Sequence, residues 1–194
     1  MLTKIDDKNL NFIEYYLYYT NSKLVPILHE LGFIPNDITT ISLLLSLIGI
    51  YFIYKKQTKL GIFFMFISYY LDATDGYMAR YYKQYSVFGD WYDHITDWVS
   101  WGIIIIILFF NLQKNKNKYI YLIISLIIST LYMIQIGCEE ELMAKENTHH
   151  FSSSTLYFFR SLCTKNPDRK MRVLKYFSAT MFISYLLLLI YITN

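Results

Sequence analysis

The chain has 194 residues, of which 55% are hydrophobic and 19% aromatic, and its formal net charge is +3. This composition is too apolar for an ordinary soluble domain, and the length suits one domain, residues 1–194, embedded in a membrane. The small basic excess does not indicate a nucleic-acid partner, but it suits a chain that lies against anionic membrane lipids.

The first predicted element is an interfacial helix within residues 8–33. Its sequence, FIEYYLYYTNSKLVPILHELG, mixes tyrosines and aliphatic residues with charges, which places tyrosines at headgroup depth. Pro35, Asn36 and Asp37 follow it and predict the start of a spanning helix, with Asn36 or Asp37 as its N-cap.

Five stretches are long and apolar enough, or nearly so, to cross a hydrocarbon core of about 30 Å. They cover residues 38–54, 60–78, 87–112, 119–137 and 177–192. We therefore predict an all-α integral membrane protein, with five to six transmembrane helices over residues 34–194. A sixth helix would have to come from residues 138–175, where the apolar part, 155–163, is too short to span and indicates a short or re-entrant helix.

The distribution of lysine and arginine predicts the orientation in the membrane. Twelve of these residues lie on the side of the N-terminus, the loop after the second span and residues 138–175, and six lie on the other side. The positive-inside rule then makes the first side cytoplasmic. No signal-peptide pattern precedes the first span, so that span is expected to act as the insertion signal.

The two cysteines, Cys138 and Cys163, stand in neither a CxxC nor a zinc-like spacing. The sequence therefore predicts no disulfide framework and no structural zinc site.

Four aspartates in the second and third spans are the main chemical signal: Asp72, Asp75, Asp93 and Asp97. An aspartate at mid-bilayer costs roughly 2.5–3.5 kcal/mol on insertion scales, so these must face the bundle interior. Residues three or four apart share one helix face, and a short hairpin joins the two helices, so the two pairs can meet. Carboxylates alone suit a hard cation such as Mg²⁺, Mn²⁺ or Ca²⁺, which commonly shares its coordination with phosphate.

Small and basic residues beside these acids fit a phosphate ligand. Gly76 and Ala79 leave room for a ligand beside the carboxylates, and Gly89 gives the same clearance on the third span. Arg80 adds a planar cation suited to phosphate oxygens.

The pattern Asp72-x2-Asp75-Gly76-x2-Ala79-Arg80-x8-Gly89-x3-Asp93-x3-Asp97 resembles the complete signature of the CDP-alcohol phosphotransferase family. Pro35-Asn36-x2-Thr39 also resembles a short motif that opens the first span in many members. The resemblance covers about residues 34–101. After residue 101 only the general hydropathy of the chain is similar. It implies a phospholipid-synthesising membrane transferase that moves a substituted phosphate from a CDP-alcohol to an acceptor alcohol and releases CMP. It also implies a six-span core and a homodimer.

The resemblance further implies roles for single residues. Two divalent cations, Mg²⁺ or Mn²⁺, would be bound by Asp72, Asp75, Asp93 and Asp97. Asp97 would also be the general base that takes the proton of the acceptor hydroxyl. The substrate site would include Gly76, Ala79, Arg80, Ser86, Gly89, Asn36 and Thr39.

The substrates stay open at this point. The donor is either CDP-diacylglycerol, with a polar acceptor such as inositol, serine or glycerol phosphate, or CDP-choline or CDP-ethanolamine, with diacylglycerol as acceptor. The runs Leu71-Asp72-Ala73 and Asp93-His94 lean toward the second pair. Two functions of other classes compete: a membrane cation transporter, which needs acids but no Arg80, and an inactive scaffold.

A basic run in residues 160–172 has two readings. The favoured reading is attraction to anionic lipid at the membrane surface. In the sharper reading, Arg160 or Arg169 binds the phosphate of an acceptor or lipid. Asp90, which lies outside the signature, and His149 and His150 are expected to be solvated.

Overall fold

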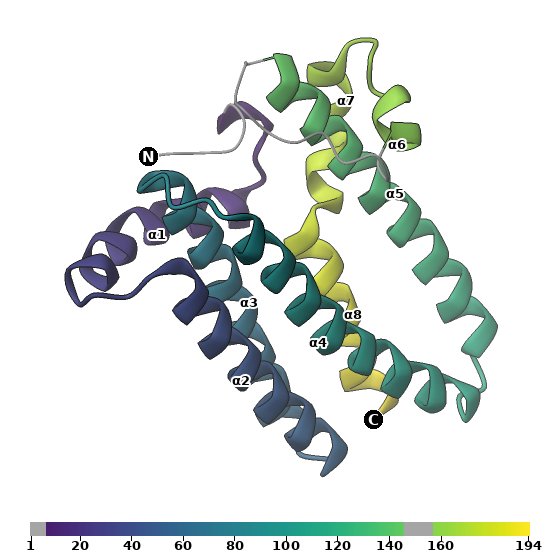
Figure 1. Ribbon diagram of the computed structural model, residues 1–194. Helices are drawn as coiled ribbons and strands as arrows, with labels where there is room; N and C mark the ends of the chain where they lie inside the picture. The colour runs from purple at the N-terminus through teal and green to yellow at the C-terminus, as the bar shows by residue number, and fades with distance from the viewer. Residues whose placement is uncertain (1–6, 146–156) are drawn as a thin grey trace. The chain divides into compact units, whose positions relative to one another are not determined.

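The computed structural model describes residues 7–145 and 157–194, and the regular structure in these ranges is helical (Figure 1). The elements are η1 (Asp7–Asn9), α1 (Phe12–Glu30), α2 (Pro35–Tyr54), α3 (Thr58–Tyr81), α4 (Val87–Gln113), α5 (Lys118–Lys145), α6 (Tyr157–Ser161), α7 (Pro167–Leu174), η3 (Lys175–Phe177) and α8 (Ala179–Thr193). Long helices follow because backbone polar groups in a bilayer must bond within their own segment. The all-α prediction is confirmed.

Within residues 7–145 and 157–194, four stretches are long and apolar enough to cross a membrane: Pro35–Tyr54, Val87–Gln113, Lys118–Met143 and Pro167–Thr193. They correspond to the predicted first, third, fourth and last spans. The predicted second span falls within α3, a 24-residue helix whose charged residues lower its hydropathy. The exact number of spans therefore stays a prediction. His149 and His150 lie outside the described residues.

The chain forms two compact units, and the first comprises residues 17–116 and 187–194. Within it, α2 and α3 form a tightly packed antiparallel hairpin (Figure 1). A Cβ atom on Gly61 would lie 2.7 Å from the carbonyl oxygen of Gly49, so the backbones approach as closely as glycine allows. One to two turns further toward the start of α2, Ser42 and Ser68 each donate a 2.9 Å hydrogen bond to the other's carbonyl oxygen.

Hydrogen bonds between buried side chains attach two further helices to this hairpin. Ser46 of α2 and Ser100 of α4 have their hydroxyl oxygens 2.7 Å apart. Asn21 of α1 and Thr74 of α3 form a 2.9 Å hydrogen bond, and both are almost fully buried. Because a buried polar group needs a partner, these bonds specify how the helices are rotated about their axes.

The start of α2 differs from the prediction. Ile34 is the N-cap and Pro35 is the first helical residue. The Asp37 carboxylate accepts a 3.1 Å hydrogen bond from the Ile34 backbone N–H, as the third-position acid of a capping box does. The predicted cap at Asn36 or Asp37 was wrong, because proline is favoured at the first helical position.

The second unit comprises the described residues 7–16, 117–145 and 157–186, and in it α6 packs against α5. Gly137 allows this contact, since a Cβ there would lie 2.6 Å from the Phe159 carbonyl carbon. Beside it, Cys138 and Cys163 form a disulfide with their Cα atoms 5.0 Å apart. The prediction of no disulfide was wrong, because two isolated cysteines carry no spacing signal and only the packing of α6 brings them together.

Candidate metal centre and active site

Three of the four predicted aspartates meet within the first unit. Asp72 and Asp75 lie in the last turns of α3, and Asp93 lies in the second turn of α4. Each offers one carboxylate oxygen, and the three oxygens lie within 4.8 Å of one another. Asp75 is buried, and the other two are half-buried.

This cluster fits a hard divalent cation. Ions such as Mg²⁺ bind oxygen at about 2.1 Å, so ligands on one ion stand about 3–4 Å apart, close to the spacing found here. The set contains neither sulfur nor imidazole, which argues against a soft metal. Ionised carboxylates so near one another repel, and a bound cation would offset that repulsion.

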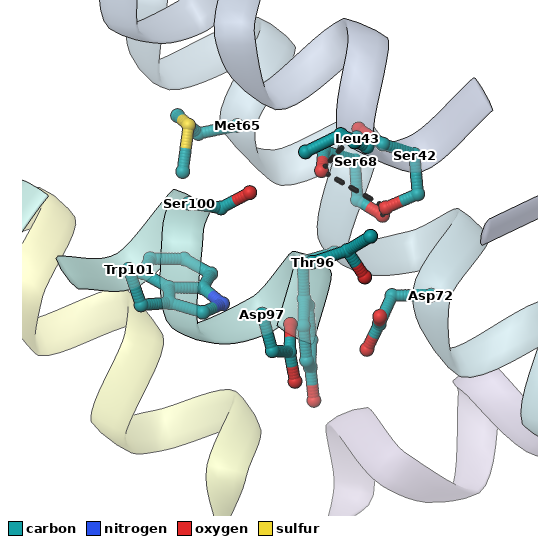
Figure 2. Close-up of a pocket in the computed structure, with 10 residues that line it drawn as sticks. Ser42, Leu43, Met65, Ser68, Asp72, Thr96, Asp97, Ser100 and Trp101 are labelled. Atoms are coloured by element: carbon teal, nitrogen blue, oxygen red, sulfur yellow. Dashed lines mark hydrogen bonds between the residues drawn. The ribbon is translucent and has the colours of Figure 1, made fainter. Parts of the chain in front are cut away.

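Asp97 holds a different position from the other three aspartates. It lies one turn further along α4, is half-buried, and lines a small pocket together with Asp72 (Figure 2). The indole of Trp101, four residues on, is a hydrogen-bonding neighbour of its carboxylate. Asp97 therefore lies beside the cluster of three aspartates and also lines this pocket.

Thr39 contacts the acid cluster directly. Its hydroxyl donates a 2.5 Å hydrogen bond to the Asp75 carboxylate, and both side chains are buried. The residue lies in the second turn of α2, so the first span supports an acid on the second. The sequence singled out Thr39 for the nucleotide pocket and did not indicate this contact.

Asn36, Ser86 and Gly89 lie together where the first turns of α2 and α4 meet. Ser86 is the N-cap of α4, and its hydroxyl oxygen accepts a 2.9 Å hydrogen bond from the Gly89 backbone N–H. A Cβ on Gly89 would stand 2.9 Å from Asn36 Oδ1. Ser86 therefore has a structural role, and Gly89 makes room for Asn36.

Arg80 is the last residue of the predicted signature on α3. Its guanidinium lies back over Gly76, where a Cβ would be 3.3 Å from Nη1. Its Nε is buried and has no hydrogen-bond partner among the described residues. A buried cationic donor without a partner indicates a missing acceptor, such as an anionic ligand. Ala79 is half-buried, and its carbonyl accepts the Gln84 N–H that ends the helix.

Several residues near the acids were not predicted as site residues. Trp101 and five hydroxyl residues line the pocket beside Asp97: Ser42, Ser68, Tyr69, Thr96 and Ser100. A usable signal existed, because serines recurring at helical spacing inside apolar spans mark interior faces. His94, in contrast, is exposed.

The basic run in the second unit is divided between two environments. Arg160 is paired with Glu141 at 2.8 Å, so its charge is already matched. Arg169, Lys170 and Arg172 are exposed on α7. The favoured lipid-surface reading suits the exposed residues better than it suits Arg160.

The fold and the cluster together define a helical membrane protein with an all-oxygen site that could bind a metal. Residues 32–193 match the family model described as CDP-alcohol phosphatidyltransferase. The chain therefore belongs to the CDP-alcohol phosphatidyltransferase family.

One curated relative is a protein of Arabidopsis thaliana named probable CDP-diacylglycerol–inositol 3-phosphatidyltransferase 2. The two are 34% identical over 76 residues, which is 39% of this chain and 33% of the relative. The match thus spans about a third of the relative's length. No solved structure matches the chain.

Proposed function

We propose that this protein transfers a substituted phosphate from a CDP-alcohol to an acceptor alcohol and releases CMP, as a step of phospholipid synthesis. The observation that carries the proposal is the meeting of Asp72, Asp75 and Asp93 on two helices of a chain that belongs to this family. Structural reasons alone do not account for three such acids in apolar helices, because buried acids in membranes usually serve function.

The proposed substrates are CDP-diacylglycerol and inositol. The name of the Arabidopsis relative supports this pair. It outweighs the lean toward CDP-choline or CDP-ethanolamine, which depended on a few residues around Asp72 and Asp93. Serine and glycerol phosphate are the competing acceptors.

Asp72, Asp75, Asp93 and Asp97 would hold two divalent cations, Mg²⁺ or Mn²⁺. When bound, these ions neutralise charge on the substrate phosphates and so favour attack on phosphorus. Thr39 holds one oxygen of Asp75 and fixes the orientation of that carboxylate. Support from such a neighbour raises the precision of a metal ligand.

Arg80 would bind an oxygen of the CDP phosphates through its buried Nε. Gly76 leaves the guanidinium uncovered on the side of its own helix. Asn36, Ser86 and Gly89 would form the rim of the nucleotide site. A buried donor that lacks an acceptor also favours a phosphate ligand over a pathway for cations.

Asp97 would act as the general base. It takes the proton of the acceptor hydroxyl while the hydroxyl oxygen forms a bond to the phosphorus that carries the alcohol group. The bond from that phosphorus to the oxygen of CMP breaks, and CMP leaves. The site is proposed to face the cytoplasm, in agreement with the lysine and arginine count, and the active form is proposed to be a homodimer.

The test uses purified full-length protein in lipid nanodiscs with labelled CDP-diacylglycerol, Mg²⁺ and one acceptor at a time. The acceptors are inositol, serine, glycerol phosphate and, with CDP-choline as donor, diacylglycerol. We expect CMP and the matching phospholipid with at least one pair, and at least about 100-fold less with Asp97→Asn. CMP release no higher than in the Asp97→Asn protein for every pair would contradict the proposal, and cation flux would then favour a transporter.

A further inference from the structure

A small pocket lies between α2, α3 and α4 and is lined on one side by Asp72 and Asp97 (Figure 2). Its wall holds five hydroxyl groups, the phenol of Tyr69 and those of four aliphatic residues, Ser42, Ser68, Thr96 and Ser100. All four are at least nine-tenths buried. The free space is about that of one water molecule, so a single hydroxyl group fits and a phosphate does not.

The hydroxyl hydrogens of three wall residues are directed at backbone carbonyls. Ser42 and Ser68 donate to each other's carbonyl oxygen at 2.9 Å. Thr96 donates to the carbonyl of Asp93 at 2.8 Å. A hydroxyl has one hydrogen and two lone pairs, so each of these groups can still accept but has no hydrogen left to donate.

The partner of the fourth hydroxyl hydrogen, that of Ser100, follows by elimination. Ser46 donates to the Leu43 carbonyl at 2.7 Å, so it is the acceptor in its 2.7 Å contact with Ser100. The Ser100 hydroxyl therefore donates its hydrogen to the Ser46 hydroxyl oxygen on α2. The Ser42 and Ser68 hydroxyl oxygens also lie 3.1 Å apart, so each of the four aliphatic hydroxyls keeps at least one lone pair to accept with and has no hydrogen left to donate.

The lining therefore favours a ligand that donates hydrogen bonds. The Asp72 and Asp97 carboxylates add acceptors and negative charge on the same wall. A phosphate or carboxylate would be repelled there, and the side-chain donors on the wall are the Tyr69 hydroxyl and the Trp101 indole, which already hydrogen-bonds Asp97. An uncharged hydroxyl group has a hydrogen to give and the right size.

Resting on the proposed function, we propose that this pocket, here named the hydroxyl pocket, is a subsite for the acceptor alcohol. It takes one hydroxyl of the acceptor and so presents a neighbouring hydroxyl to Asp97. The reacting hydroxyl loses its proton to Asp97 and forms the bond to phosphorus as CMP leaves, while the hydroxyl in the pocket stays unchanged.

This arrangement selects a chemical class of acceptor. The acceptor needs at least two neighbouring hydroxyls and no negative charge near them, which describes an uncharged polyol. An alcohol with one hydroxyl leaves the pocket unfilled, and an acceptor with a phosphate next to its hydroxyls brings charge toward two carboxylates. Thr96, Ser100 and their partners would thus set acceptor specificity.

The test compares wild type with Thr96→Val, which keeps the shape of the side chain and removes its oxygen. Thr96→Ser restores the oxygen, and Ser100→Ala probes a second wall residue. The control is Thr130→Val on α5, where the hydroxyl also bonds a carbonyl of its own helix, that of Leu126 at 2.8 Å. KM and kcat are measured in nanodiscs for CDP-diacylglycerol and for inositol, and glycerol phosphate is the anionic comparison.

We expect Thr96→Val and Ser100→Ala to raise the inositol KM about tenfold, as loss of one hydrogen bond to a buried hydroxyl does. The KM for CDP-diacylglycerol should stay within about twofold, which also reports an intact fold. Thr96→Ser and Thr130→Val should resemble wild type, and glycerol phosphate should be the poorer acceptor.

An unchanged inositol KM in Thr96→Val and Ser100→Ala would overturn this inference, as would equal use of glycerol phosphate by wild type. A fall in kcat alone would also overturn it, because it would mean that the pocket holds a resident water. In each of these cases wild type still releases CMP and the proposed function stands. If wild type releases no CMP with any acceptor, the proposed function itself fails.

Discussion

Thr39 at the start of the first span hydrogen-bonds Asp75 near the end of α3, at 2.5 Å. The bond joins two helices at the point where the three carboxylates meet. It engages one oxygen of the Asp75 carboxylate, which also contributes an oxygen to the cluster. An acid that we propose as a metal ligand is therefore oriented by the protein alone, which would lower the cost of ordering the site.

Replacing Thr39 with valine should weaken metal activation more than it weakens folding. We expect the Mg²⁺ concentration for half-maximal CMP release to rise about tenfold, as loss of a supporting bond to a metal ligand typically does. Thr39→Ser should retain most of the wild-type value. A Mg²⁺ titration of CMP release measures both, and identical curves for wild type and Thr39→Val would show that the bond has no such role.

Two glycines of α4 should respond in opposite directions to alanine. At Gly89 a Cβ would crowd Asn36 and the Ser86 cap, each 2.9 Å away, whereas at Gly102 nothing lies within 4 Å. We expect Gly89→Ala to cost about 1 kcal/mol of stability and to lower CMP release. Gly102→Ala should be neutral or stabilise by up to about 1 kcal/mol. Thermal unfolding in detergent checks this pair, and equal shifts would count against the packing at Gly89.

The hairpin of α2 and α3 should not tolerate a larger residue at Gly61. A Cβ there would lie 2.7 Å from the Gly49 carbonyl oxygen and 2.9 Å from the Ile53 backbone nitrogen, and backbone atoms cannot move aside singly. We expect Gly61→Ala to destabilise the protein by about 1–3 kcal/mol. Thermal unfolding midpoints measured beside Gly102→Ala test this, and a Gly61→Ala protein as stable as wild type would contradict the close approach.

The Cys138–Cys163 disulfide should be detectable and stabilising in the second unit. The two residues are 25 apart in sequence, and a closed loop of this length stabilises by about 3 kcal/mol in the chain-entropy model. We expect Cys163→Ser to lower the unfolding midpoint. Denatured wild type should react with maleimide only after reduction, as mass spectrometry would record, and labelling without reductant would argue against the bond.

The acid cluster could be predicted from sequence because the residue spacings that define it lie within two consecutive helices. The spacings of Asp72 to Asp75 and of Asp93 to Asp97 are helix-face spacings, and a short hairpin between the helices leaves little freedom in how they meet. The cost of a charge in hydrocarbon supplied the remaining constraint. The metal-binding roles of these residues still await experiment.

Contacts between distant helices could not be predicted in the same way. The bond from Thr39 to Asp75 and the exchange between Ser42 and Ser68 depend on the rotation of each helix, which no local pattern specifies. The disulfide depends on α6 folding back onto α5. Small residues such as Gly49 indicate close packing but do not identify their partner.

The most direct test of the central claim is the metal dependence of CMP release in wild type, Asp75→Asn and Asp168→Asn. Asp168 is the matched control, because it is an exposed aspartate on α7, in the second unit and outside the acid cluster. Its carboxylate pairs with Lys8 at 3.5 Å. Protein stripped with EDTA should lose CMP release by about 100-fold and recover it with Mg²⁺ or Mn²⁺.

CMP release by Asp75→Asn should stay about 100-fold below that of wild type even at saturating metal. Release by Asp168→Asn should equal that of wild type. CMP release that survives EDTA, or that Asp75→Asn leaves unchanged, would contradict a catalytic metal centre built from these carboxylates.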